Sequence, residues 1–403
     1  MVILVLNCGS SSIKYQVLDM RTDAEYSLLA KGLVERIGLE SGILSHRVPG
    51  KDKYEVESPI PNHTDGIKKV LDILVHASLG VLESLSGIEA VGHRVAHGGE
   101  FFNSSKKVDN SVIEGIEQLC ELAPLHNPAN LLGIRAVESL MPGTPQVAVF
   151  DTSFHQTMPN YAYMYPIPYE YYDKYKIRRY GFHGTSHKFV AKRACDLAGI
   201  DFNRSKVITC HLGNGSSITA IQDGKSVDTS MGFTPLEGMI MGTRCGDIDP
   251  GIITFLEEKE GLSSDKMNGV LNKKSGFLGL FGTSSDARDI EKAAHDNNDA
   301  KAKLVLDILY YRIVKYIGAY TAAMGGVDMI VFTGGIGEND VDVRERVGKQ
   351  FSYMGLDFSA EANDGVRGKD VILTKPGSKV LMATIATNEE LVIAQDTMKI
   401  VKS

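Results

Sequence analysis

The sequence predicts an α/β protein made of two similar domains with a cleft between them. Apolar runs of strand length alternate with stretches whose apolar residues recur at helical spacing, and this alternation occurs in both halves of the chain. The halves also share a motif: NCGSSSI at 7–13 and GNGSSI at 213–218 each follow an apolar strand and open a hairpin. We interpret this as a weak internal duplication, although a chance match stays open because hairpin turns generally favour Gly, Asn and Ser.

The first half is predicted to form a sheet covered by a helix. An apolar run at 2–6, a Gly/Ser turn and an alternating segment at 12–18 read as two strands joined by a tight loop. Strand-like segments continue to about Val56, and apolar residues over 67–75 recur at helical spacing. Further strands are expected at 88–95 and 146–150, so the helix packs on a sheet of several strands.

In the second half the pattern restarts after Asp151. It predicts a helix from about Ser186, strands at 206–211 and 217–222 around a Gly/Asn/Ser turn, and a tight turn at 223–224. A long helix over 300–324 precedes a buried strand at 329–332. That strand runs into the glycine-rich turn GGIGEN, and a helix from Asn388 closes the sequence.

Composition narrows the class of function. The 403 residues carry a formal net charge of −7 with no long basic run, which disfavours nucleic acid and membrane surfaces as partners. No segment approaches the roughly 20 apolar residues of a membrane span, and the N-terminal apolar run lacks a basic leader. The five cysteines are widely spaced and form no C-x-x-C pair, so a reduced, cytoplasmic location is expected.

Three Gly/Ser loops could hold phosphate groups. They lie at 7–14, 211–217 and 334–339, each at the exit of an apolar strand, where backbone N–H groups can approach an anion without Cβ clashes. Each loop alone could be a plain turn, and the P-loop and dinucleotide-binding patterns are both absent. Three such loops together favour nucleotide binding.

Arg94 stands on a strand-like segment that enters a pair of glycines, where its guanidinium could grip a carboxylate or phosphate with two hydrogen bonds. A surface ion pair is the plainer alternative. The flanking His93 and His97 could suggest zinc, but no third ligand with matching spacing follows.

Asp151 follows an apolar strand, the position at which α/β sheets present functional side chains. It could orient a nucleophile or a metal-bound water, or it could simply cap the next turn. A hydrolase built from Asp151, Ser153 and His155 is a weak rival, because the G-x-S-x-G elbow is missing. His183 and Arg244 have glycine neighbours that permit close approach to a ligand, although a core histidine and a solvated arginine are the plain readings.

Taken in order along the chain, these motifs resemble the acetate and propionate kinase family. The resemblance spans essentially the whole sequence, and NCGSSSIK and RRYGFHGTSH are its most distinctive parts. The matching segments are NCGSSSIKY, GHRVAHGGE, APLHNP, FDTSFH, RRYGFHGTSH, HLGNGSS, MGFTPLEGMIMGTR, GGIGEN and TNEE.

The resemblance implies two ribonuclease-H-like domains of the superfamily that unites acetate and sugar kinases, actin and chaperone ATPases, with the ATP cleft between them. The first domain would comprise residues 1–151 plus 387–403. The second, at 152–386, would hold the nucleotide site and the interface of a homodimer.

The resemblance also implies a role for each matching residue. The catalytic residues would be Arg94, Asp151, His183 and Arg244. The acid would lie against Arg94, Ala96, Leu125, Phe182 and Pro235. The nucleotide would contact Lys14, His211, Leu212, Gly213, Asn214, Gly215, Asp286, Ala287, Arg288, Gly335, Ile336, Gly337, Glu338 and Asn339. The metal ligands would be Asn7 and Glu389.

The implied activity is reversible, direct in-line transfer of a phosphoryl group from ATP to acetate, which yields acetyl phosphate and ADP. ATP is the co-substrate and Mg²⁺ the metal, with Mn²⁺ able to replace it; the pathway is acetyl-CoA biosynthesis. Propionate kinase activity with the same mechanism is the alternative, and an actin-like or chaperone-like ATPase is a more distant one.

Three residues depart from the family pattern. Ala96 stands where valine is common and enlarges the acid pocket, so propionate should be well tolerated. Ala287 replaces a common methionine, and Cys245 replaces a common serine beside Arg244, where a nearby cation could lower the thiol pKa unless burial cancels the effect. None of the three removes a charged group.

Overall fold

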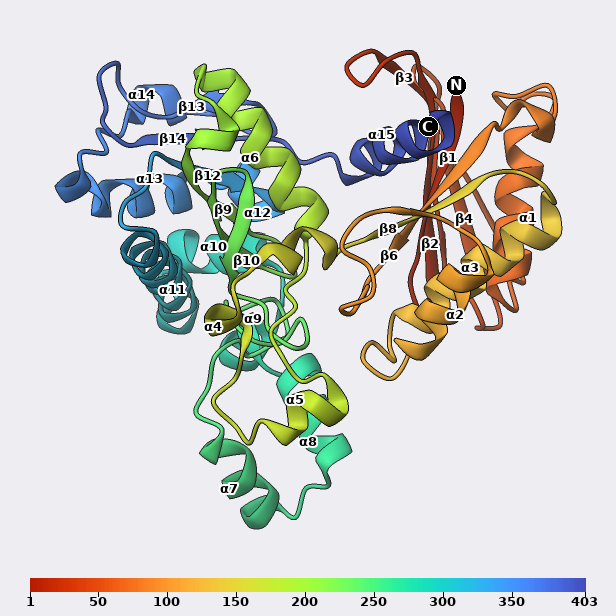
Figure 1. The fold of residues 1–403 in the computed structure, drawn as a ribbon. Coiled ribbons are helices and arrows are strands. Elements are labelled where there is room, and N and C mark those ends of the chain that lie inside the picture. The colour runs from red at the N-terminus through yellow and green to blue at the C-terminus, as the bar shows by residue number, and fades with distance from the viewer. The chain divides into compact units, whose positions relative to one another are not determined.

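The computed structural model describes all residues, Met1–Ser403. The chain divides into two compact units, one formed by Met1–Phe154 with Asn388–Ser403 and the other by His155–Thr387. Each unit contains one mixed sheet with helices on its faces (Figure 1), so the predicted α/β class is confirmed. None of the helices is long and apolar enough to cross a membrane.

The first unit is built on an eight-stranded sheet of order β5-β4-β3-β2-β1-β6-β8-β7. Strands β1 to β5 form an antiparallel meander, whereas β1, β6 and β8 are neighbours and run parallel. The strands are β1 (Val2–Cys8), β2 (Ser12–Met20), β3 (Tyr26–Glu35), β4 (Gly42–Arg47), β5 (Tyr54–Ser58), β6 (Ala90–Val95), β7 (Lys106–Lys107) and β8 (Gln146–Phe150).

Helices cover both faces of this sheet. Helices α1 (His63–Leu74) and α3 (Asn127–Leu140) pack on one face, and α2 (Asn110–Gln118) packs on α3. The C-terminal helix α15 (Glu389–Lys402) packs on β1, β2, β6 and β8. Gly92 of β6 permits this approach, because a Cβ there would lie 2.6 Å from the side chain of Ile393. The residues of α15 nearest its start are thereby held beside the central strands.

The second unit has a six-stranded sheet of order β11-β10-β9-β12-β14-β13. Its antiparallel β11-β10-β9 run and its parallel β9-β12-β14 run repeat the arrangement of β3-β2-β1 and β1-β6-β8. The two sheets therefore share one topology, as the predicted internal duplication requires. The strands are β9 (Lys206–His211), β10 (Ser217–Gln222), β11 (Lys225–Thr229), β12 (Met329–Thr333), β13 (Val371–Ile372) and β14 (Leu381–Thr384).

Two long helices cover this second sheet. Helix α6 (Gly184–Ala198) packs on β9 and β12, and α11 (Ala300–Met324) packs on β9 and β10. Side chains of α11 such as Leu309 and Ile313 are buried against Ile208 and Phe332 of the sheet. The other helices are α4 (Asn160–Tyr163), α5 (Glu170–Tyr175), α7 (Gly251–Glu260), α8 (Ser264–Lys273), α9 (Gly276–Phe281), α10 (Ala287–Asp296), α12 (Gly334–Asn339), α13 (Val341–Gln350) and α14 (Ala360–Asn363).

Two predicted elements differ from the structure. The glycine-rich segment GGIGEN is a short helix, α12, rather than a turn, because the chain enters it through Gly334 at φ 77° and then continues helically. The helix expected from Ser186 begins at Gly184, and His183 is its N-cap with φ 56°, a left-handed conformation that is uncommon outside glycine. Both differences arise at strand or helix ends that carry predicted site residues.

Candidate functional site

In the first unit, three neighbouring parallel strands bring predicted site residues to one edge of the sheet. Asn7 is the penultimate residue of β1, Arg94 is the penultimate residue of β6, and Asp151 directly follows β8. Parallel strands end at the same edge, which is where α/β sheets carry ligand sites. Residues separated by more than 140 positions in the sequence therefore become neighbours.

Arg94 is the centre of this cluster. Its Nε donates to Asp151 Oδ1 at 3.1 Å, and its Nη2 donates to Asp151 Oδ2, so the pair is bidentate. Its Nη1 also donates to Asn7 Oδ1 at 3.3 Å. The side chain of Asp151 is only 1% exposed and that of Arg94 is 25% exposed, so this is not the surface ion pair that the sequence left open.

Glu389 enters the same cluster from α15. It is the first residue of the helix, and its Oε2 lies 4.0 Å from Arg94 Nε. Burial raises the pKa of Glu389 to about 7; Arg94 opposes this shift, while Asp151 and Glu390 add to it. Burial disfavours the Arg94 cation, but Asp151 and Glu389 outweigh it and raise the Arg94 pKa above its usual range. The cluster thus holds more carboxylates than cations.

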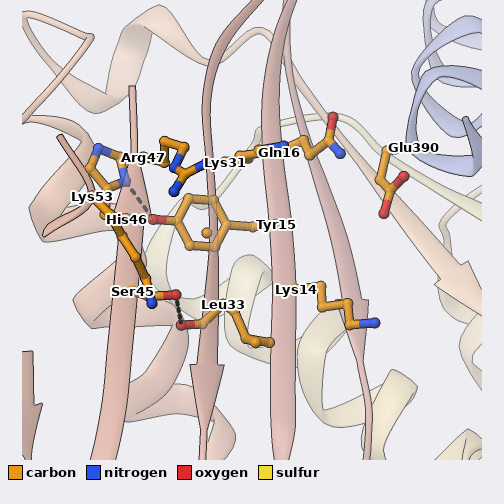
Figure 2. A pocket seen from close by; sticks show the side chains of 11 residues that line it. Lys14, Tyr15, Gln16, Lys31, Leu33, Ser45, His46, Arg47, Lys53 and Glu390 are labelled. Carbon is orange, nitrogen blue, oxygen red and sulfur yellow. Dashed lines mark hydrogen bonds between the residues drawn. The ribbon is translucent and has the colours of Figure 1, made fainter. Parts of the chain in front are cut away.

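Lys14 lies directly opposite Asn7 in the β1–β2 pair and belongs to the same neighbourhood. It lines a hollow of about 360 Å³ on the side of the sheet that also carries Glu390 of α15 (Figure 2). Lys31 and Arg47, from β3 and β4, line the hollow as well. Cations therefore outnumber carboxylates in the lining, although the chain as a whole is acidic.

Two buried asparagines of α3, which sequence reasoning missed, hold the loop after β6. Asn130 accepts from Ala96 N at 3.0 Å and donates to the carbonyl of Cys8 at 2.7 Å, which ties the ends of β1 and β6 together. Asn127 both accepts from His97 N and donates to its carbonyl. The two asparagines in LHNPAN are the sequence signal that could have revealed this role, and the structure shows both to be buried.

In the second unit, two of the predicted nucleotide loops are joined through Leu212. Its N–H donates to the carbonyl of Thr333 at the end of β12, and its own carbonyl accepts from Ile336 N and Gly337 N of α12. His211 is paired with Thr333 in the parallel β9–β12 ladder. The segments 211–215 and 334–339 therefore form one surface at the carboxyl ends of two parallel strands, as predicted phosphate loops require.

Gly215 brings three predicted residues together. A Cβ at this position would lie 3.5 Å from Arg244 Nη1 and 3.6 Å from His183 Cε1, so the bare backbone lies beside both side chains. Arg244 is half-buried and held by the carbonyl of Pro235 at 2.9 Å, with no carboxylate in an ion pair. Burial lowers the Arg244 pKa. An uncompensated guanidinium beside a glycine loop is suited to an anion.

His183 is fixed by several contacts. Its Nδ1 lies 2.9 Å from Ser217 Oγ, and its ring stacks on that of His211 with centroids 4.3 Å apart. The main-chain carbonyl of His183 accepts from His187 N at 2.9 Å. Its ring is therefore part of a packed group of histidines rather than a mobile surface side chain.

Several of the predicted nucleotide contacts are engaged in local structure. Asp286 is the N-cap of α10 and pairs with the exposed Arg288 through Nε at 3.0 Å and Nη2 at 2.6 Å. The carboxylate of Glu338 accepts from Gly334 N at 2.9 Å and Thr387 N at 3.0 Å, so it stabilises the backbone around α12. Asn339 donates to the carbonyl of Gly335 at 2.9 Å. Contacts of these side chains with a nucleotide stay a prediction.

The four predicted apolar contacts of the acid fall in different units. Ala96 is buried beside Arg94, and Leu125, at 61% exposed, precedes α3. Phe182 is buried with Met231 and Met241 in the second unit, where Pro235 also lies. A pocket shared by these residues stays a prediction.

The alternatives that the sequence left open find no support in these contacts. Asp151 pairs with Arg94, and Ser153 Oγ donates to the carbonyl of Phe150, so neither forms a hydrolase triad. His93 bonds Gln146 at 2.8 Å, and no group of three or more His, Cys, Asp or Glu side chains could hold a metal. Burial raises the pKa of the Cys245 thiol, which is the opposite of the lowering by Arg244 considered from the sequence.

Comparison with known proteins decides the family. The model of the Acetokinase family matches residues 2–395. This chain belongs to the acetokinase family. The family prediction made from the sequence motifs is thereby confirmed.

Members of the family match along the full length. The chain is 56% identical to an acetate kinase of Thermoanaerobacter pseudethanolicus over 402 residues, which covers 100% of this chain and 99% of that protein. Among solved structures, Porphyromonas gingivalis acetate kinase is 49% identical with a TM-score of 0.96, covering 99% of both chains. A Francisella tularensis propionate kinase is 40% identical with a TM-score of 0.90, again covering 99% of both chains.

Proposed function

We propose that the protein is an acetate kinase, which transfers the terminal phosphoryl group of ATP to acetate and releases acetyl phosphate and ADP, reversibly and by direct in-line transfer. The observation that carries this proposal is the full-length similarity, at 54–56% identity, to relatives named acetate kinase. The clusters around Arg94 and around Gly215 supply the groups that such a reaction needs.

The first-unit cluster suits the acid. Arg94 can offer donors to the carboxylate of acetate, and its bidentate pairing with Asp151 fixes the guanidinium plane. A short-chain acid is already ionised at neutral pH, as aspartate and glutamate side chains are, so no strong base is needed. Asp151 therefore orients Arg94 and the bound water or metal rather than removing a proton from the nucleophile.

The second-unit cluster suits the triphosphate. Backbone N–H groups of the Gly213–Gly215 loop can hold phosphate oxygens, as in other glycine loops at strand ends. Arg244 and His183 flank Gly215, and both can donate to the equatorial oxygens of the transferring phosphoryl group. Phosphoryl transfer depends mainly on alignment and charge neutralisation, which these groups provide.

The donor set at Asn7 and Glu389 fits a partial magnesium site. Both offer hard oxygen ligands, and Mg²⁺ commonly keeps several waters and substrate phosphates beside one or two protein oxygens. Asn7 and Glu389 would hold the ion, with Mn²⁺ as a substitute of the same ligand preference. When bound, the metal would neutralise charge on the phosphate oxygens.

The test is an assay of ADP formation with purified protein, ATP and Mg²⁺, with and without acetate. We expect ADP to form at a rate that rises with acetate concentration and saturates, with one acetyl phosphate made per ADP. ADP formation that is independent of acetate would instead indicate an actin-like or chaperone-like ATPase of the same fold.

Propionate kinase activity is the second candidate, and Ala96 favours it. The residue is buried beside Arg94, and the absence of two methyl groups relative to valine leaves room for a longer acid. One methylene more or less in the substrate changes kcat/KM by about 10- to 200-fold in an apolar pocket. The test is therefore to compare kcat/KM for acetate with kcat/KM for propionate. An Ala96→Val variant that loses propionate activity more than acetate activity would place the acid against Ala96.

We also propose that the enzyme is a cytoplasmic homodimer joined through the second unit and that its acetyl phosphate serves acetyl-CoA biosynthesis. Large apolar side chains are exposed on that unit, including Tyr161 at 85%, Tyr169 at 62% and Phe255 at 57%. Exposed aromatic side chains of this kind are typical of protein interfaces.

A further inference from the structure

A buried hydrogen-bond chain runs from the core of the second unit to His183. Thr209 Oγ1 lies 2.7 Å from His187 Nδ1, His187 Nε2 lies 2.7 Å from Ser217 Oγ, and Ser217 Oγ lies 2.9 Å from His183 Nδ1. Thr209, His187 and Ser217 are each 0% exposed. These residues belong to β9, α6 and β10, so hydrogen bonds link three elements of the fold to the His183 ring.

Hydrogen positions in this chain follow from counting donors and acceptors. Burial lowers the pKa of His187 well below its usual value, so its ring is neutral and carries one N–H. Ser217 has one hydroxyl hydrogen for two imidazole neighbours. If His187 donates from Nε2 to Ser217, then Ser217 is free to donate to His183 Nδ1; if Ser217 donates to His187, His183 must donate from Nδ1.

Thr209 decides between the two directions. Its hydroxyl has one hydrogen-bond neighbour, His187 Nδ1, and Thr209 itself is fully buried in β9. If His187 donated to Thr209, the threonine hydrogen would be buried without an acceptor, which is costly. When Thr209 donates to His187 Nδ1, every hydrogen along the chain has an acceptor. The low-energy direction therefore runs from Thr209 towards His183.

We propose that Thr209, His187 and Ser217 are positioning residues that hold the His183 ring with its hydrogen on Nε2. The inference rests on the proposed function, in which His183 faces the transferring phosphoryl group. A ring with the hydrogen on Nε2 presents a donor to an anion, whereas the opposite tautomer presents a lone pair and repels it. His187 also fixes the backbone, because its N–H donates to the carbonyl of His183.

Long-range ¹H–¹⁵N spectra of the full-length protein labelled with ¹⁵N-histidine test the tautomers directly. A His183→Gln variant and a His187→Gln variant identify the two sets of ring signals among the 11 histidines. We expect both rings at pH 7.5 to carry their hydrogen on Nε2. A His183 signal with the hydrogen on Nδ1 would overturn the proposal. This readout needs no activity, so it stands apart from whether acetate is the substrate.

Substitutions at His187 then test whether its Nε2 donor to Ser217 is the contact that positions His183. Glutamine keeps a donor near the Nε2 position that faces Ser217, whereas asparagine keeps a group only near Nδ1. We expect His187→Gln to retain kcat better than His187→Asn by about fivefold to tenfold, the effect of one orienting hydrogen bond, with KM for ATP within about twofold. Equal kcat values for the two variants would contradict the proposal.

Breaking the chain at Ser217 gives a third comparison. Ser217→Ala should lower kcat by about fivefold to tenfold and move the His183 ring signals. Thr219→Val is the matched control, because Thr219 is a buried hydroxyl directly opposite Thr209 that bonds Thr229 outside the chain. We expect this control to keep the His183 signals and kcat. A Ser217→Ala variant with unchanged His183 signals would refute the inference.

Discussion

Two arginines of the candidate site differ sharply in their surroundings. Arg94 is held by the Asp151 carboxylate and lies close to Glu389, so its charge is already matched within the first unit. Arg244 has no carboxylate partner and is held only by the Pro235 carbonyl and the Met241 sulfur. The Arg94 guanidinium is therefore already oriented by a carboxylate, whereas the Arg244 guanidinium has no carboxylate to balance its charge.

Replacing Arg244 with alanine should lower kcat by about a hundredfold or more, because loss of one donor to a transition-state oxygen costs about 2.7 to 4 kcal/mol. Steady-state kinetics with varied ATP and acetate would measure this. Arg346→Ala, which removes an exposed arginine paired with Asp307, is the control and should keep wild-type kcat. An effect on KM alone would mean that Arg244 binds only the ground state.

Asp151→Asn should lower kcat/KM for acetate by about a hundredfold, because Arg94 loses the partner that fixes its plane and small misplacements of a binding group carry such costs. The asparagine keeps the size of the side chain, so the change reports mainly on charge. Glu117→Gln removes a carboxylate from an exposed pair with Arg135 and should change little. Near-normal turnover of Asp151→Asn would refute the orienting role.

At the scale of elements, the strand-to-loop junctions carry the site. In the second unit, β9 and β12 end side by side, and the segments that follow them are tied through the backbone of Leu212. The glycines in these segments serve two different purposes. Gly334 is required by the backbone, because it has φ 77° and a Cβ would lie 2.6 Å from the Leu212 carbonyl oxygen, whereas Gly215 has space for a methyl group.

Alanine substitutions should separate these two purposes. Gly215→Ala would place its methyl group in ordinary contact with Arg244 and His183, so we expect wild-type thermal stability but a kcat/KM for ATP at least about tenfold lower. Gly334→Ala should lower the melting temperature by several degrees, because a left-handed, crowded position penalises Cβ. Thermal unfolding and kinetics on both variants are the measurements. A Gly215→Ala variant with normal ATP kinetics would show that this loop does not approach the nucleotide.

Helix α10 and the start of α13 meet at two carboxylates, Glu291 of α10 and Asp340, the N-cap of α13. Burial, and then the neighbouring Asp340, raises the pKa of Glu291 from 4.5 to about 8. The native chain therefore binds more protons than the unfolded chain between about pH 4.5 and 8, so this pair makes the free energy of unfolding fall as pH rises through that window.

Glu291→Gln should remove this contribution and flatten the pH dependence of the melting temperature between pH 5 and 8. The melting temperature of the variant should therefore rise relative to that of the wild type as the pH approaches 8. Thermal unfolding across that range would measure it. Glu258→Gln in α7, which alters an exposed carboxylate, is the control and should leave the slope unchanged. A slope that survives in Glu291→Gln would place the titration elsewhere.

At the scale of the whole molecule, the proposed dimer predicts a solution mass of twice the 43.9 kDa chain. Size-exclusion chromatography with light scattering would measure it. The second unit exposes tyrosine and phenylalanine side chains, including Phe255 at 57%. If that surface is the interface, Phe255→Glu should weaken association, because it places a charge in an apolar contact. A wild-type mass of one chain would contradict the dimer.

The sequence by itself determined most of the elements and the family. Apolar periodicity located β9 and β10 at their observed bounds and α11 from Ala300 to Met324, because these elements are set by local patterns of burial. The short motifs around Asn7, Arg94, Asp151, His183 and Arg244 identified the family, since they state residue type and order along the chain.

Only the tertiary structure decided which of those residues meet and what holds them. The bidentate Arg94–Asp151 pair, the asparagines of α3 that tie β1 to β6, and the hydrogen-bond chain from Thr209 to His183 all join residues distant in sequence. The helical conformation of GGIGEN likewise followed from its packing on Leu212 rather than from its composition. A linear pattern records which side chains are present, whereas hydrogen bonds and burial depend on neighbours that only the folded chain supplies.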